Sequence, residues 1–294
     1  MTKPNLRDYF QLHFLVLIWG FTAILGLLAN SISPLALVFF RTAIAAVGLG
    51  AILWFTGRFV RLQGRDRTAV LLVGMVLGFH WLAFFLAARV ANASVCLAGM
   101  ATSSLWTSLL DPIFNKRAVR WVEVMLGFVI MAGLYLIFRF EFDRSLGLLI
   151  AIFSAFLAAV FTIFNAKFTQ KHDYLVLTFY EIIGAMGSIA VVMLVYWGGF
   201  DNQLKIWPQL NQWVWIVILA LVCTVYAYSQ GIKLLRKFTP FTLNLTVNLE
   251  PVYGIILAYL IFGESERMNP GFYVGTMVIL AAVLLYPMLV KKRE

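Results

Sequence analysis

The residues of this sequence that could do chemistry are a few ionisable side chains set inside long apolar runs. Glu250 lies in the stretch TVNLEPVYG, residues 246–254, directly before Pro251. Arg41, His80 and Glu181 lie inside other apolar runs. Within a lipid bilayer each such group costs roughly 2.5–3.5 kcal/mol on insertion scales, so each is a candidate for function. The chemistry open to them is charge pairing, ligand binding or proton transfer.

The run around Glu250 is polar on two opposite sides if it forms a helix. One face carries Thr242, Thr246, Glu250, Tyr253 and Gly254, and a strip roughly 160° away carries Asn244, Asn248 and Pro251. A helix of this kind cannot face lipid on either side, so it should pass through the centre of a bundle. Pro251 lacks an N–H and clashes with the carbonyl group of Val247, which predicts a kink. Either the kinked helix lines a cavity, or the kink is structural and Glu250 pairs with Arg41.

Two further groups are candidates for proton coupling. Glu181 qualifies because carboxyl groups inside membrane proteins often act as proton relays. His80 qualifies because an imidazole can change its charge in the physiological pH range. A hydrogen-bonded packing role is the alternative for His80.

Two tryptophans and one aspartate complete the set of polar or aromatic candidates. Trp19 and Trp106 lie near the middle of their runs, where they could form the wall of a cavity for an amphipathic or aromatic substrate. Core packing is the alternative for both. Asp111 comes near the end of its run, close to Lys116 and Arg117, so an ion pair that ends the helix is expected there.

These side chains must be positioned by membrane-spanning helices. The chain has 294 residues, of which 62% are apolar and 12% charged, about half the ~25% charged share of a soluble domain. A span needs about 20 apolar residues, and ten runs of that kind are predicted. They lie near 9–29, 35–56, 68–88, 92–114, 121–138, 146–168, 175–197, 212–234, 240–262 and 270–290. All function must therefore lie in an all-α membrane bundle.

The basic residues predict how the bundle is oriented. Seventeen of the 23 Lys and Arg residues lie in the two terminal segments and in the alternate connections that share their side. The C-terminal members of this set are Lys291, Lys292 and Arg293. Cytoplasmic loops of membrane proteins carry the excess of positive charge, so both termini should be cytoplasmic. This topology explains the net charge of +10, and we expect no nucleic-acid partner.

The two halves of the chain resemble each other where the fifth and tenth predicted spans lie. An offset of 148 residues pairs Gly127 with Gly275, Gly133 with Ala281 and Leu136 with Leu284. Five spans are an odd number, so the second half would enter the membrane from the opposite side. We expect two inverted five-helix repeats, residues 1–145 and 146–294, with a substrate site between them near the midplane. Small residues such as Gly20, Gly184 and Gly187 should let helices approach closely.

Several of these residues together resemble a known family. They are Trp19-Gly20, Pro34, Arg41, the stretch NLEPVYGIILAYLIFGE at 248–264, and Gly275. The chain is similar to the EamA-type branch of the drug/metabolite transporter superfamily. The resemblance implies ten helices in two inverted repeats, and a carrier of the cytoplasmic (inner) membrane that exports amino acids or other metabolites, often driven by protons. The first half departs from the pattern, because it pairs Ser104 with Glu250 and lacks the GE ending.

The sequence thus predicts a multi-pass secondary transporter that exports an amino acid or a similar small metabolite by alternating access. Its partners would be this substrate, protons and membrane lipids; no cofactor or metal is expected, and the oligomeric state stays open. Uptake of a sugar or nucleotide-sugar is the alternative within transport. An intramembrane enzyme is a remote alternative, since the sequence has neither an H-E-x-x-H nor a G-x-S-x-G motif. A scaffold or receptor would need no polar midplane.

Overall fold

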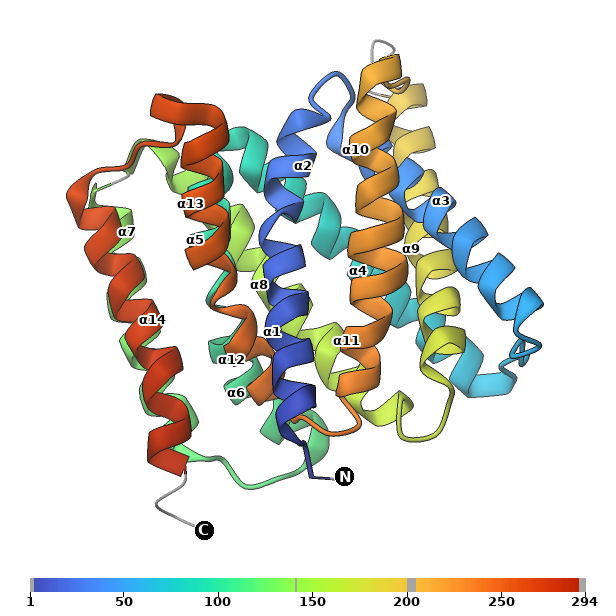
Figure 1. Cartoon of the computed structure of the whole chain (residues 1–294), viewed down its shortest axis with the longest axis horizontal. Coiled ribbons are helices and arrows are strands. Elements are labelled where there is room, and N and C mark those ends of the chain that lie inside the picture. The colour runs from blue at the N-terminus through green and yellow to red at the C-terminus, as the bar shows by residue number, and fades with distance from the viewer. Residues whose placement is uncertain (1–2, 141, 200–204, 291–294) are drawn as a thin grey trace.

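The computed structural model describes residues 3–140, 142–199 and 205–290, and these form a bundle of helices without strands (Figure 1). Eight helical stretches are long and apolar enough to cross a membrane. They are α1 and α2 (Leu6–Gly20, Thr22–Leu28); α3 (Pro34–Phe55); α4 (Gly64–Val90); α5 and α6 (Ala93–Met100, Ser103–Asn115); α8 (Ser145–Phe168); α9 (Tyr174–Gly199); η2, α10, η3 and α11 (Leu210–Gln212, Trp213–Ile218, Leu219–Tyr228, Ser229–Leu234); and α12, α13 and η4 (Pro240–Val247, Glu250–Phe262, Gly263–Glu266). These coincide with eight of the ten predicted spans.

The other two predicted spans are occupied by α7 (Trp121–Phe140), which is followed by the short η1 (Phe142–Arg144), and α14 (Pro270–Val290). Their apolar stretches with described side chains, Trp121–Ile137 and Pro270–Ala282, are shorter than those of the eight. The two helices lie side by side at one edge of the bundle (Figure 1).

Polar contacts link the helix ends and connections at each of the two ends of the bundle. Near the start of α1, at the lower end of the bundle, where Figure 1 marks the N-terminus, Asp8 pairs with Lys237 at 2.7 Å. Near the start of α4, Asp66 pairs with His172 at 2.8 Å. At the upper end, Arg89 donates to the carbonyl oxygen of Ala29 at 3.0 Å. Alternate connections therefore share an end. Lys291, Lys292 and Arg293 lie outside the described residues.

Three spans are broken near their middle. α1 gives way to α2 at Phe21, α5 to α6 at residues 101–102, and α12 to α13 at residues 248–249. The third break has the cause predicted from the sequence: Pro251 cannot continue α12, but it fits the first turn of α13, where its missing N–H is not needed. The kink expected at Pro251 is a two-residue interruption of the α-helix, at Asn248 and Leu249.

The first two breaks share a local feature. Thr22 donates its hydroxyl hydrogen bond to the carbonyl oxygen of Trp19 at 2.6 Å, and Thr102 does the same to Gly99 at 2.8 Å. A threonine hydroxyl that bonds a carbonyl group one turn back competes with the helical hydrogen bond and bends the helix. At these points the backbone hydrogen bonds also change to the tighter i−3 pattern. The N–H group of Phe21 donates to the carbonyl oxygen of Ile18, and that of Ala101 donates to Ala98.

Glycines hold several helices at close range, as expected of membrane bundles. A Cβ atom added to Gly184 on α9 would lie 2.3 Å from the carbonyl oxygen of Leu71 on α4, and one added to Gly20 would lie 3.3 Å from the Cβ of Tyr253. The packing role predicted for these two is confirmed. The same prediction was wrong for Gly187, because an added Cβ there meets nothing within 4 Å. Gly275 on α14 contacts Gly133 on α7 rather than its sequence match Gly127.

Candidate functional site

A cavity lies where the three helix breaks meet. Its volume is about 100 Å³, which is room for several water molecules at ~10–15 Å³ each. Residues on both sides of each break line it: Trp19 and Thr22 at the first, Met100 and Ser103 at the second, Val247 and Glu250 at the third. Arg41, His80 and Asn244 line it as well. Five of the eight residues singled out from the sequence therefore meet in one cavity: Trp19, Arg41, His80, Asn244 and Glu250.

Arg41 on α3 provides the positive charge of the cavity. Its side chain is 2% exposed, and its Nε donates to the Thr224 hydroxyl at 2.8 Å. The guanidinium carbon lies 4.0 Å from the ring centroid of Trp81 on α4, a cation–π contact. Thr224 lies in η3, a stretch of π-helix, and such irregular turns are frequent at functional sites. Arg41 is thus held in one orientation while it lines the cavity.

Glu250 is the first residue of α13, at the third break. It is 5% exposed, and none of the contacts among the described residues gives it a hydrogen bond or an ion pair. The pairing with Arg41 considered from the sequence is therefore not observed. Ser103, the first residue of α6, also places a buried hydroxyl without a partner at the cavity wall. A buried polar group without a partner is uncommon in proteins, and at a cavity wall it can bind water or a ligand.

The two asparagines of the ninth predicted span join the broken helices to each other. The Nδ2 of Asn244 donates to the Thr107 hydroxyl at 2.7 Å, and the Nδ2 of Asn248 donates to the Ser104 hydroxyl at 2.8 Å. Both bonds run from the α12 span to α6, so they hold the two broken spans together. Asn244 also lines the cavity, whereas Asn248 does not.

His80 on α4 is fixed by α8. Its Nδ1 lies 3.0 Å from the carbonyl oxygen of Ser154 and 2.8 Å from the hydroxyl of the same residue. The Ser154 hydroxyl donates in turn to the His80 carbonyl oxygen at 2.9 Å. Since a carbonyl oxygen only accepts, Nδ1 carries the proton in this arrangement. His80 therefore joins α4 to α8 as well as lining the cavity.

Glu181 on α9 lies behind the cavity wall. Its Oε2 accepts hydrogen bonds from the Tyr228 hydroxyl at 2.7 Å and from the Nδ2 of Asn165 at 3.3 Å. Tyr228 and Asn165 line the cavity, and Glu181 itself is fully buried. Glu181 is thus linked to the cavity through two polar side chains that the sequence did not single out.

The two mid-span tryptophans have different surroundings. Trp19 lines the cavity, and its indole packs so closely on Gly231 that an added Cβ would lie 2.9 Å from it. Trp106 instead faces a separate apolar cleft between α6, α7 and α8, and its ring contacts that of Phe156 edge-on at 5.4 Å. The structure therefore brings Trp19 to the candidate site and leaves Trp106 outside it.

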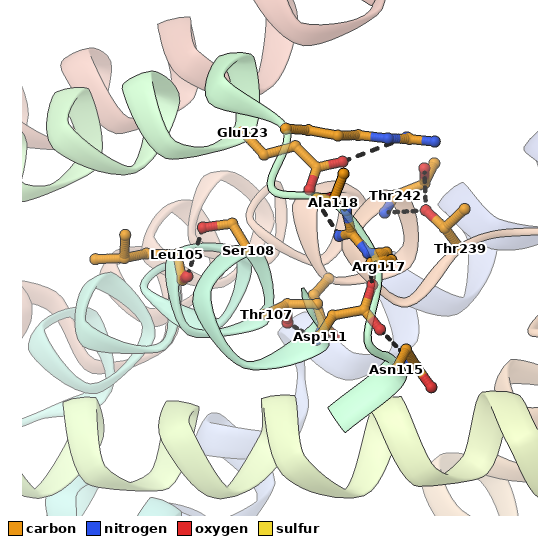
Figure 2. Close-up of polar contacts among 12 residues, drawn as sticks. Leu105, Thr107, Ser108, Asp111, Asn115, Arg117, Ala118, Glu123, Thr239 and Thr242 are labelled. Carbon is orange, nitrogen blue, oxygen red and sulfur yellow. Dashed lines mark hydrogen bonds and ion pairs between the residues drawn. The ribbon is translucent and has the colours of Figure 1, made fainter. Parts of the chain in front are cut away.

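The ion pair expected near Asp111 is present at the lower end of the bundle. Figure 2 shows Arg117 between the carboxylates of Asp111, at the end of α6, and Glu123, at the start of α7. Asn115 donates to the other oxygen of Asp111. This cluster fixes the connection between the two helices.

Glu266 is a structural carboxylate that the sequence did not single out. It accepts hydrogen bonds from the backbone N–H groups of Ala93 and Ser94, both at 3.0 Å, and from the Ser94 hydroxyl at 2.7 Å. These groups begin α5, so a residue of the second half caps a helix of the first half. The glutamate of the GE motif, Glu264, is exposed and pairs with Arg267.

A bundle of apolar helices with ionisable side chains lining a cavity between broken spans is typical of membrane transporters. The model of the EamA-like transporter family matches residues 9–139 and 145–287, so the chain belongs to that family. The resemblance expected from the sequence is confirmed. The family indicates a multi-pass membrane transporter with a small-molecule substrate and a lipid environment, and not an enzyme.

Other proteins are similar to this chain over most of its length. An uncharacterized transporter of Archaeoglobus fulgidus is 25% identical over 96% of this chain and 97% of its own. The uncharacterized transporter YdfC of Bacillus subtilis is 21% identical over 69% of this chain and 66% of its own. A solved crystal structure of another protein has a TM-score of 0.71 over 96% of this chain and 98% of that chain, at 17% identity. That likeness supports the fold alone.

Proposed function

We propose that this transporter exports an amino acid, or a closely related zwitterionic metabolite, across the cytoplasmic (inner) membrane by alternating access, in exchange for protons. The observation that carries the proposal is that Arg41 and Glu250 line one buried cavity without an ion pair between them among the described contacts. Both side chains remain open to a ligand, and an ammonium group would supply the counter-charge that an ionised Glu250 lacks. A substrate with one carboxylate and one ammonium group matches both.

The surroundings of each charge favour this match. Arg41 is held over the Trp81 ring, and a guanidinium group fixed in place binds a carboxylate with more geometric specificity than an ammonium group does. The start of α6, with the unpartnered Ser103 hydroxyl, adds hydrogen-bond donors and the positive end of a helix dipole. Glu250 is the acceptor for an ammonium group, and Trp19 gives the rest of the substrate an aromatic wall.

The proposed transport cycle rests on two five-helix repeats, residues 1–145 and 146–294, which form ten spans of opposite orientation with both termini in the cytoplasm. The family model matches two segments of similar length on either side of residues 140–144, which supports this division. The fourth and ninth predicted spans are both broken, at 101–102 and at 248–249, and α7 and α14 make reciprocal glycine contacts. Export itself is proposed from the resemblance to the family.

The direction of transport can be tested in cells that overproduce the protein. We expect lower retention of a labelled amino acid and resistance to a toxic analogue, both lost in the Glu250→Gln variant at equal membrane levels. An untargeted comparison of the medium from cells with and without the gene would identify the substrate. Higher retention would overturn export, and enrichment of a sugar or nucleotide-sugar would overturn the substrate class.

A further inference from the structure

The most unusual polar group outside the cavity surface is the Glu181 carboxyl group. The Oε1 atom of Glu181 is buried and has no hydrogen-bond partner, although Oε2 accepts two. Asn165, which donates to Oε2, likewise has a buried Oδ1 without a partner. Two orphaned acceptor oxygens therefore belong to two side chains that already share one hydrogen bond. A buried acceptor without a donor costs about 1–3 kcal/mol.

No cation is positioned to compensate an ionised Glu181. None of the ion pairs of the described residues involves it, and the side chain is 0% exposed. The ionisable groups on the elements packed around it are Arg65, Asp66, Arg67, His80 and Arg89 on α4, Arg41 on α3, Cys223, Tyr226 and Tyr228 on η3, Lys233 on α11 and Lys167 on α8. Of these only Tyr228 contacts the carboxyl group. An uncompensated charge at this depth is far more costly than a neutral carboxyl group.

We propose that Glu181 and Asn165 form a proton-binding site. A proton on Oε1 turns this atom from an acceptor into a donor. An acid and an amide can then pair through two parallel hydrogen bonds, Asn165 Nδ2–H to Oε2 and Glu181 Oε1–H to Oδ1, so one proton satisfies both orphaned oxygens. On release, the proton passes to water in the cavity and leaves the carboxylate bonded to the Tyr228 hydroxyl. Tyr228 and Asn165 line the cavity and are the route between the two sites.

The geometry favours Glu181 over His80 as the coupling residue. His80 already uses its Nδ1 to join α4 to α8. A proton added to its other nitrogen would put a second positive charge on the cavity wall that Arg41 occupies. A proton on Glu181 instead neutralises a charge, and it does so outside the space that the substrate would fill.

Infrared difference spectroscopy of the purified protein tests the site without any transport. We expect the wild type and Glu250→Gln to share one carboxylic acid C=O stretch that is lost on alkalinisation and that is absent in Glu181→Gln. The Glu250→Gln variant is the matched control, because it removes the buried carboxyl group of the cavity wall, which can contribute a separate C=O band of its own. Asn165→Ala should shift the frequency of the Glu181 band without abolishing it. The proposal is overturned if Glu181→Gln keeps every C=O band of the wild type, or if Asn165→Ala shifts none of them.

The link between this site and transport rests on the proposed function and needs a second measurement. In proteoliposomes with an imposed pH gradient, we expect Glu181→Gln to reduce the gradient-driven flux of the substrate at least tenfold. The variant should still exchange substrate when no gradient is imposed. Flux that follows a sodium gradient and ignores pH would contradict proton coupling. If no amino acid moves in the wild type, the proposed substrate fails, while the infrared result still decides the proton site.

Discussion

At the scale of single residues, Arg41 is the side chain whose exact chemistry matters most. A lysine at this position would keep the charge but lose both the planar contact with Trp81 and the Nε hydrogen bond to Thr224. A hydrogen bond to a charged group contributes about 1.5–3 kcal/mol, which corresponds to roughly tenfold or more in binding. We therefore expect Arg41→Lys to lower substrate affinity at least tenfold in flux assays, while Arg61→Lys, in an exposed connection, changes nothing. If Arg41→Lys and the wild type bind the substrate with equal affinity, Arg41 is not part of the substrate site.

Glu266 provides a residue-scale test of stability. Glu266→Gln would weaken three hydrogen bonds at the start of α5, so we expect a loss of about 1–3 kcal/mol and a lower melting temperature in detergent. Glu264→Gln is the matched control, because that side chain is 73% exposed and an exposed ion pair contributes little. The assignment fails if the two variants melt together.

Sequence reasoning found the charges of the cavity but not all of its partners. Arg41 and Glu250 were predictable because an ionisable residue in an apolar run is costly wherever it lies. Trp81, Asn165 and Tyr228 were not, because aromatic and amide residues are common in such runs and only tertiary contacts distinguish these three. Glu266 was missed for the same reason: its partners lie 172 and 173 residues away in the chain.

At the scale of helices, hydropathy predicted the positions of the spans. The sequence predicted only one of the three breaks. Pro251 predicted a kink in the ninth predicted span. The breaks after Gly20 and Met100 coincide with threonine hydroxyls that bond carbonyl groups one turn back, but Thr42 makes the same kind of bond inside the unbroken α3. Local sequence therefore could not single out these two.

The close contact between α4 and α9 gives a prediction at this scale. Gly184→Ala would place a methyl group 2.3 Å from the Leu71 carbonyl oxygen, so we expect the helices to separate and the melting temperature to fall. Gly187→Ala lies in the same helix but meets nothing within 4 Å. It should be neutral or stabilising by up to ~1 kcal/mol, because alanine favours a helix more than glycine does. The reverse order of stability would show that the α4–α9 contact is looser than described.

At the scale of the whole molecule, the distribution of positive charge predicts orientation. Cysteines placed at Arg61 and Ser265 lie in exposed connections at opposite ends, and the native Cys96 and Cys223 are buried. We expect a membrane-impermeant thiol reagent to label Ser265→Cys in intact cells and Arg61→Cys only after the membrane is opened. Labelling in the opposite order would invert the proposed topology.

The central claim is that one cavity recognises both charges of a zwitterion, and competition in proteoliposomes tests it most directly. Uptake of the labelled amino acid would be measured against excess unlabelled amino acid, its decarboxylated amine and its deaminated acid. We predict strong competition from the amino acid and at least tenfold weaker competition from either single-charge analogue, since each leaves Arg41 or Glu250 without its partner. Equal competition by the amine or the acid would contradict the account.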